Sequence, residues 1–314
     1  MSPMLNLLWK PCNNNGYISF HKGELVKGES KLNQIKIFAD STCDLSEDLI
    51  KKYDVSIIPL MISLGEKSLK DGIEVNPQQI YDWSDQTGET PKTAAPSIGD
   101  VMDLLSPYVK EKRSIIFFGI SEAMSATCNV LRLAAENLNY HDLHVVDSKN
   151  LSTGIGLQLI RAAELAMKGC TVKEIIEDNN RINPKVRASF VVDTLTFLHR
   201  GGRCSAVTAL LANTLKLKPK IVVINGKMDV AKKYRGNQKS VILKYVKDME
   251  EDLKNADSDR VFITHSSCPD EVIEEVKDYL RRLNIFKEVI VTQAGGVISS
   301  HCGPNTLGVL YISK

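Results

Sequence analysis

The sequence predicts an α/β protein: an N-terminal domain with a mostly parallel sheet flanked by helices, and a C-terminal α+β domain with a mostly antiparallel sheet. The chain has 314 residues, which is more than one hydrophobic core usually supports, so we expect two domains. From Ile35 onward, short apolar segments alternate with helical segments, which is typical of parallel βαβ units. After about residue 187, strand-like segments follow one another around a hairpin-type turn, which favours antiparallel pairing.

The domain boundaries follow from where these patterns begin and change. Residues 1–34 show neither helical nor strand periodicity and contain an Asn triplet, so we expect a loosely ordered extension, or an incorrectly assigned start. Residues 35–187 are then the N-terminal α/β domain, and residues 188–314 are the C-terminal α+β domain.

The N-terminal domain is expected to begin with a buried strand at 35–40, a helix at 46–53 and an apolar strand at 55–64. Further elements are expected in the following order: helices at 78–83 and 98–109, a strand at 115–120, a helix at 126–138, a strand at 143–147, and helices at 156–168 and 172–182. Asp40, Ser121 and Asp147 follow three of the strands. Because the carboxyl ends of parallel strands share one edge, these residues should cluster there, where such sheets bind ligands.

The C-terminal domain is expected to combine strands with one long amphipathic helix at 269–283. The strands lie within 188–205, 219–235, 260–265 and 288–299. Asn225 and Gly226 stand between two alternating segments, which is a strong indication of an antiparallel hairpin.

Composition excludes several classes of protein. Forty basic and 38 acidic residues give a formal net charge of +2, which is too small for a nucleic-acid-binding surface. The seven cysteines form no Cys-x-x-Cys pair that would indicate a zinc site, and their odd number without an export signal favours reduced thiols in the cytoplasm. No run approaches the roughly 20 apolar residues needed to span a membrane.

The most informative segment is 115–127, where an apolar run ends in a hydroxyl-rich loop and a helix begins. Ser121, Ser125 and Thr127 lie at the carboxyl end of the expected strand and the amino end of the expected helix. Free backbone N–H groups and the helix dipole attract anions at such a place. Capping of the helix explains the same residues, so this segment alone leaves both interpretations open.

A second hydroxyl-rich loop spans 91–100. Ser97 is expected to cap the helix that follows, whereas Thr93 lies outside that helix among small residues, where its hydroxyl can approach a ligand. Arg203 follows Gly201 and Gly202, and its planar guanidinium suits a carboxylate or phosphate, although a plain turn with solvent-facing arginines is equally consistent. His301 lies within the Gly-rich segment 294–308, an unusual place for a purely structural histidine.

A serine hydrolase is the enzymatic alternative. The segment from Gly119 to Ala123 differs by one residue from the G-x-S-x-G nucleophile elbow. Ser121 would be the nucleophile, Asp193 the orienting acid, and His265 or His301 the base. No His-Gly-Gly-Gly segment precedes it, and the sequence also lacks the phosphate-loop, dinucleotide-binding and H-E-x-x-H zinc motifs. We therefore expect neither a cofactor nor a metal.

Seven segments together resemble the DegV family of fatty-acid-binding proteins, which includes the lipid-carrying subunits of bacterial fatty acid kinase. The resemblance runs from about Ile35 to Lys314. Its segments are ADSTCDLS, PKTAAPS, ISEAMSAT, VVDSKNLSTGIG, FVVDTLTFLHRGGR, LKLKPKIVVINGK and GGVISSHCGPNTLG.

The resemblance implies a bacterial, cytoplasmic protein that holds one long-chain fatty acid, such as palmitate, in an apolar tunnel between its domains. By this resemblance the carboxylate contacts are Thr93 and Ser125, and His301 and Arg203 match two further family motifs. Arg235 matches a family arginine near the phosphoryl-transfer end. A separate ATP-dependent kinase subunit would form the acyl phosphate, so this chain would be a carrier and not an enzyme.

The sequence departs from the family pattern at a few positions. The family commonly has Ser-Gln where this chain has Ala94 and Ala95, and Gly where it has Ala126 and Asn305. The first change is expected to alter the carboxylate pocket, and the other two to stiffen loops or require strained backbone angles. An interaction protein with a vestigial pocket is a third functional class, beside the carrier and the hydrolase.

Overall fold

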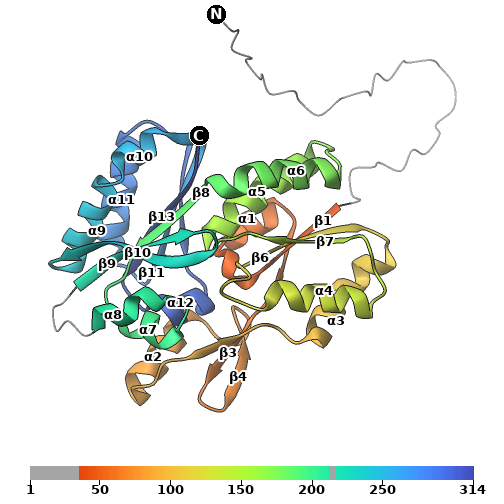
Figure 1. Cartoon of the computed structure of the whole chain (residues 1–314), viewed down its shortest axis with the longest axis horizontal. Helices are drawn as coiled ribbons and strands as arrows, with labels where there is room; N and C mark the ends of the chain where they lie inside the picture. Colours follow the sequence, from red (N-terminus) through yellow and green to blue (C-terminus); the bar gives the residue numbers. More distant parts are fainter. Residues whose placement is uncertain (1–34, 212–216) are drawn as a thin grey trace, which may run out of the picture.

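The computed structural model of the chain describes residues 35–211 and 217–314 (Figure 1). The predicted extension, residues 1–34, lies outside the described residues. The described chain contains a four-stranded, a six-stranded and a three-stranded sheet with helices packed around them. No helix in these two ranges is both long enough and apolar enough to cross a membrane.

The four-stranded sheet is entirely parallel, with strand order β2-β1-β6-β7. Its strands are β1 (Ile35–Asp40), β2 (Val55–Ile58), β6 (Ser114–Gly119) and β7 (Leu143–Asp147). Helices α3 (Ile98–Lys110) and α4 (Thr127–Asn137) cover one face, packing on side chains such as Phe38 and Phe117. The other face is covered by α1 (Glu47–Lys52), α5 (Thr153–Met167) and α6 (Val172–Ile182).

The six-stranded sheet has strand order β10-β9-β8-β13-β11-β12, and every pair except β11–β12 is antiparallel. Its strands are β8 (Val186–Val191), β9 (Leu217–Ile224), β10 (Lys227–Arg235), β11 (Ala256–Ser266), β12 (Glu288–Gln293) and β13 (Thr306–Ser313). The outer face is covered by α9 (Gln238–Lys247), α10 (Glu250–Lys254) and α11 (Asp270–Arg282), as Figure 1 shows. The predicted fold class, a parallel sheet followed by a mostly antiparallel one, is confirmed.

Helix α5 lies between the two large sheets. It contacts β1 and β6 of the parallel sheet and β8 and β13 of the antiparallel sheet, and every residue from Thr153 to Ile160 is buried. A helix that is apolar on all sides is expected in such a place. The largest hydrophobic cluster accordingly combines side chains from both sheets, among them Phe118 and Leu310. The division into two domains at residue 187 stays a prediction.

The predicted strand 55–64 is wrong in one respect, because it is two strands in different sheets. Pro59 has no backbone N–H to donate, so the parallel pairing of β2 ends at Ile58. The chain then enters the three-stranded antiparallel sheet, which has order β4-β3-β5. Its members are β3 (Met61–Leu64), β4 (Lys67–Lys70) and β5 (Lys92–Ala94), packed near α2 (Pro77–Thr87), α7 (Thr196–Gly201) and α12 (Gly296–Cys302).

Further helices differ from the sequence-based expectation, and one of them, α7, lies within the segment 188–205 that was expected to form a strand. Helices α9 and α10 were not predicted, although α9 begins at the capping residue Asn237 and buries four apolar or aromatic side chains at helical spacing. His301 was placed in a Gly-rich loop but lies in α12. The remaining short elements are α8 (Thr208–Leu211) and the 3-10 turns Ser41–Cys43, Asn183–Lys185 and Ser205–Val207.

Candidate functional site

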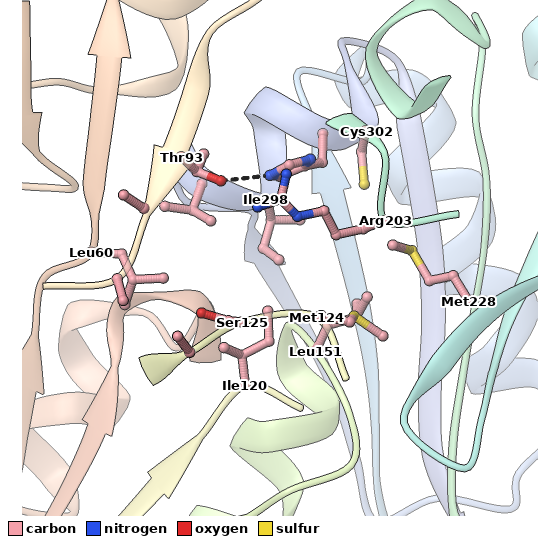
Figure 2. A pocket seen from close by; sticks show the side chains of 15 residues that line it. Leu60, Thr93, Ile120, Met124, Ser125, Leu151, Arg203, Met228, Ile298 and Cys302 are labelled. Atoms are coloured by element: carbon pink, nitrogen blue, oxygen red, sulfur yellow. Dashed lines mark hydrogen bonds between the residues drawn. The ribbon is translucent and has the colours of Figure 1, made fainter. Parts of the chain in front are cut away.

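A cavity of about 320 Å³ lies where β5, the loop after β6, α12 and the β9–β10 hairpin meet (Figure 2). This volume is at the lower end of the usual range for small-molecule pockets. Four polar side chains line it, namely Thr93, Ser125, Arg203 and His301. The other lining residues are Leu60, Ala94, Ala95, Ile120, Met124, Ala126, Leu151, Met228, Val297, Ile298 and Cys302. The cavity therefore combines an apolar wall with a few polar groups from distant parts of the sequence.

A second cavity of about 20 Å³ lies directly beyond the first and shares Leu151, Ile298 and Cys302 as lining residues. It reaches toward Phe190 and Leu310 of the antiparallel sheet. Leu151, Ile298 and Cys302 therefore separate the cavity with the polar groups from a small apolar space beside the antiparallel sheet.

Thr93 and His301 contact each other across the cavity wall. Thr93 lies on β5, which pairs with β3 so that Thr93 stands opposite Ile62. Its Oγ1 lies 2.7 Å from Nε2 of His301, the contact drawn as a dashed line in Figure 2. The pairing of β5 in a sheet therefore fixes the hydroxyl that the sequence placed in a loop.

His301 is neutral at physiological pH. Burial lowers the pKa of its imidazole to about 4, and the positive charge of Arg203 acts in the same direction. Nδ1 is buried and has no hydrogen-bond partner. An unpaired buried N–H is rarer than an unpaired acceptor, so we assign the proton to Nε2. His301 then donates to Thr93, which leaves the Thr93 hydroxyl proton available to an acceptor in the cavity.

Ser125 is held in a comparable way at the start of α4. Its Oγ lies 2.8 Å from Oγ1 of Thr127 and accepts the backbone N–H of Thr127 at 3.3 Å. The capping interpretation is thus partly correct, because Ser125 satisfies an N–H group of the first turn. The backbone N–H of Thr127 donates to Ser125 Oγ, and either hydroxyl can be the donor between Ser125 and Thr127. When Thr127 donates, the Ser125 hydroxyl proton is available to a ligand in the cavity.

Arg203 is the cationic residue of the lining. It follows Gly202, which ends α7 in the left-handed conformation with φ of 68°, so the predicted turn is present. Arg203 Nη1 donates to the Gly201 carbonyl at 2.7 Å. A Cβ added to Gly201 would lie 2.2 Å from His301 Nδ1. Glycine at 201 is therefore what allows the imidazole to pack against the end of α7.

Two carboxyl groups that the sequence analysis did not single out position α12. Asp44 accepts the Gly295 N–H at 2.8 Å and the Ser152 hydroxyl at 2.6 Å, and Asp71 accepts the Gly296 N–H at 2.8 Å. Burial raises the pKa values of both, that of Asp44 to about 8. The ADSTCDLS motif contains Asp44, but nothing in the sequence alone connects Asp44 to Gly295, which lies 251 residues later in the chain.

The predicted cluster at the edge of the parallel sheet is present. Asp40 accepts the Ile120 N–H at 2.7 Å, and Asp147 accepts the Glu122 N–H at 3.3 Å. Both carboxyl groups hold the backbone of the loop after β6. They thereby position the cavity-lining residues of that loop.

The catalytic arrangement of a serine hydrolase is not assembled. Ser121 Oγ donates to the Gly226 carbonyl at 2.8 Å, and no histidine in the described ranges hydrogen-bonds to it. Asp193 forms an ion pair with Lys218. His301 contacts Thr93 instead, and His265 lines the smaller cavity. Nothing in this geometry supports Ser121 as a nucleophile.

Arg235 is separate from the other predicted site residues. It is the exposed last residue of β10 and does not line the cavity. Within residues 35–211 and 217–314, no group of three or more His, Cys, Asp and Glu side chains could hold a metal ion. Cys204 and Cys302 near the cavity are free thiols.

The family model described as "Uncharacterised protein, DegV family" matches residues 34–314. The chain belongs to the DegV family. A DegV domain-containing protein of Clostridium perfringens is 31% identical over 287 residues, covering 90% of this chain and 100% of the relative. The family membership that the motifs predicted is confirmed.

Solved DegV structures share the fold. A DegV family protein from Thermus thermophilus, described by its fatty acid binding, has a TM-score of 0.82 and 27% identity, covering 90% of this chain and 100% of that one. DegV from Bacillus subtilis, described as a fatty acid binding protein, has a TM-score of 0.77 and 25% identity, covering 90% and 99%.

Proposed function

We propose that this protein binds one long-chain fatty acid, such as palmitate, with its carboxylate against Thr93 and Ser125. The observation that carries the proposal is the convergence of two hydroxyls, each with a donor behind it, on an apolar cavity. A carboxylate only accepts hydrogen bonds, so two hydroxyl protons suit it. The fatty acid binding described for the Thermus and Bacillus relatives supports the same conclusion.

The energetics suit a carrier. Each buried methylene contributes about 0.8 kcal/mol, so the acyl tail supplies most of the affinity. A hydrogen bond to a charged group contributes about 1.5–3 kcal/mol, which is enough to fix the headgroup without a buried cation. Arg203 is exposed, so its positive charge attracts the carboxylate while the guanidinium group stays hydrated.

The carboxylate end is proposed to be presented to a separate ATP-dependent kinase subunit in the cytoplasm. In that reaction a carboxylate oxygen attacks the γ-phosphorus of ATP, the acyl phosphate forms and ADP leaves. The sequence itself has no phosphate-binding loop motif, which supports assigning ATP binding to another chain. Arg235 on β10 is proposed to lie near the phosphoryl-transfer end.

Native mass spectrometry tests the binding proposal. The purified protein, delipidated and then incubated with palmitate or oleate, should carry one acyl chain. Thr93→Ala combined with Ser125→Ala should raise the Kd by about a hundredfold, because two hydrogen bonds to a charged group are lost. An unloaded wild-type protein after incubation would contradict the proposal.

The matched control is Thr87→Ala combined with Ser106→Ala. These hydroxyls donate to the carbonyls of Trp83 and Met102 within helices and do not line the cavity, so binding should be retained. The same loaded sample should give no acyl hydroxamate when treated with ATP and hydroxylamine. Hydroxamate formation by the purified chain alone would overturn the assignment of kinase activity to a partner.

A further inference from the structure

The tip of the β9–β10 hairpin reaches the parallel-sheet half of the molecule. Asn225 and Gly226 form the turn with φ values of 49° and 80°, the left-handed conformation that two-residue hairpins require. Figure 1 shows the hairpin extending toward β6 and β7. Hairpin tips are usually exposed, yet Gly226 is buried. The turn is therefore held against another part of the chain.

Its contact is with Ser121, the residue that resembles a hydrolase nucleophile. Ser121 Oγ donates to the Gly226 carbonyl at 2.8 Å, and Ser121 is only 1% exposed. A Cβ added to Gly226 would lie 2.5 Å from that Oγ and 3.6 Å from the Lys149 Cα. The contact therefore needs a hydroxyl at position 121 and no side chain at position 226.

Both partners of this contact are directly linked to the cavity. On the hairpin, Met228 follows two residues after Gly226 and lines the cavity. On the other side, the Ser121 carbonyl accepts the N–H groups of Met124 and Ser125 at 2.9 and 3.1 Å. In Figure 2, Met228 lies on the hairpin side of the cavity, across from Met124 and Leu151. The contact thus joins two walls of the same cavity.

The contact between Ser121 and Gly226 matters because β10 lies at the edge of its sheet. Among the strands that the structure describes, β10 is at the edge of the six-stranded sheet and pairs with β9 alone. An edge hairpin has a strand partner on one side only, so a contact at its tip limits its local opening, in addition to the bond from Cys204 Sγ to the Met228 carbonyl at 3.7 Å. A buried hydrogen bond from Ser121 supplies such a contact.

We propose that Ser121 and Gly226 form a clasp that keeps the Met228 wall closed over the bound acyl chain and sets the rate at which the fatty acid leaves. The proposal rests on the proposed function. Ser121 acts through the hairpin and is a positioning residue, not a nucleophile. The segment from Gly119 to Ala123, which resembles a nucleophile elbow in sequence, thereby has a positioning role.

Ligand dissociation kinetics test the clasp. The protein is loaded with the fluorescent fatty acid cis-parinaric acid and mixed in a stopped-flow instrument with excess oleate. Ser121→Ala should raise the dissociation rate roughly five- to tenfold with little change in the association rate, because interface contacts act mainly on dissociation. Ser106→Ala, which removes a hydroxyl bonded to the Met102 carbonyl, should leave both rates unchanged.

A double-mutant cycle separates the clasp from general destabilisation. Gly226→Ala should speed dissociation in the wild-type background, where the new methyl meets Ser121 Oγ. In the Ser121→Ala background the atoms nearest to the new methyl lie 3.6 Å away, so Gly226→Ala should increase the dissociation rate much less. Backbone strain at position 226 is the same in both backgrounds and therefore cancels in the comparison. Multiplicative effects of the two substitutions would overturn the clasp.

Failure of the clasp and failure of the function give different results. If wild-type protein binds no fatty acid, the proposed function falls and the clasp falls with it. If wild-type protein binds but Ser121→Ala dissociates at the wild-type rate, only the clasp is wrong. Amide hydrogen exchange of the ligand-free protein should also be faster at 225–228 in Ser121→Ala, and unchanged exchange there would contradict the proposed fixing of the tip.

Discussion

At the level of single residues, the cavity depends on how closely the His301 ring packs against Gly201. The neutral imidazole donates through Nε2 to Thr93 while its Nδ1 faces the end of α7. A charged histidine would instead need a partner at both nitrogens. The low pKa of His301 and the missing side chain at 201 therefore both favour the contact between Nε2 and the Thr93 hydroxyl at the cavity.

Gly201→Ala is predicted to weaken fatty acid binding. The added methyl would overlap His301 Nδ1 and displace the ring from Thr93, so we expect the Kd to rise about tenfold, the equivalent of one hydrogen bond to a charged group. Isothermal titration calorimetry with palmitate measures this. Gly99→Ala in α3 is the matched control, because its Cβ would meet open space except for Ser97 Oγ at 4.0 Å. Equal affinities for the two variants would contradict the prediction.

At the level of elements, α12 is a helix whose position is set by side chains distant in sequence. It begins at two glycines, which have poor helix propensity, and its first N–H groups are satisfied by Asp44 and Asp71 from the other half of the chain. Asp40 is buried beside them. Burial raises the pKa values of Asp44 and Asp40, and the negative charge of Asp71 raises both further. The helix that carries His301 is therefore sensitive to the protonation of this group of acids.

Asp44→Asn is predicted to stabilise the protein increasingly as the pH rises. Burial raises the pKa of Asp44 from 3.8 to about 8 in the folded state, so between these values the folded state binds more protons than the unfolded state. The stability contributed by this group is complete below pH 3.8 and is lost as the pH rises toward 8. The amide does not titrate and still accepts from Gly295.

Thermal unfolding at pH 5 and pH 8 measures the effect. The difference in Tm between Asp44→Asn and wild type should be larger at pH 8. Asp54→Asn, at an exposed carboxyl that pairs with Lys36, is the control and should not show this trend. A difference that shrinks as the pH rises would contradict the prediction.

At the level of the whole molecule, the two large sheets share the core around α5. The helix is buried between them, and the largest hydrophobic cluster contains residues from both. The cavity lies at the same junction, and residues of both halves line it. Separate sheets here do not imply separate units of folding.

Unfolding is therefore predicted to be a single cooperative transition. Removing either half would expose the apolar surface of α5, which costs roughly 25 cal/mol per Å², so neither half should persist alone. Scanning calorimetry of the ligand-free protein should give one peak whose calorimetric and van't Hoff enthalpies agree. Two resolved peaks would show that the halves on either side of residue 187 unfold independently.

Much of the fold could be predicted from local patterns. The alternation of apolar strands with helices revealed the parallel sheet, and the Asn225–Gly226 pair revealed the hairpin. Ser97 was correctly identified as a cap, since its hydroxyl accepts the Asp100 N–H at 3.1 Å. Asn305 adopts φ of 57°, in line with the strained backbone angle that the family resemblance led us to expect there. Each of these depends on residues close together in the sequence.

The sequence by itself determined the fold class, the family and four side chains that the structure brings to one cavity. Only the tertiary structure decided that His301 belongs to a helix, that Pro59 separates strands of two different sheets, and that Ser121 contacts Gly226 and not a histidine. For Ser121 and His301, those outcomes depend on partners more than a hundred residues away. For Pro59, they depend on the pairing of β3 with β4 and β5 in a separate sheet. Local propensity carries no information about such contacts, because their free energy arises only when the halves pack together.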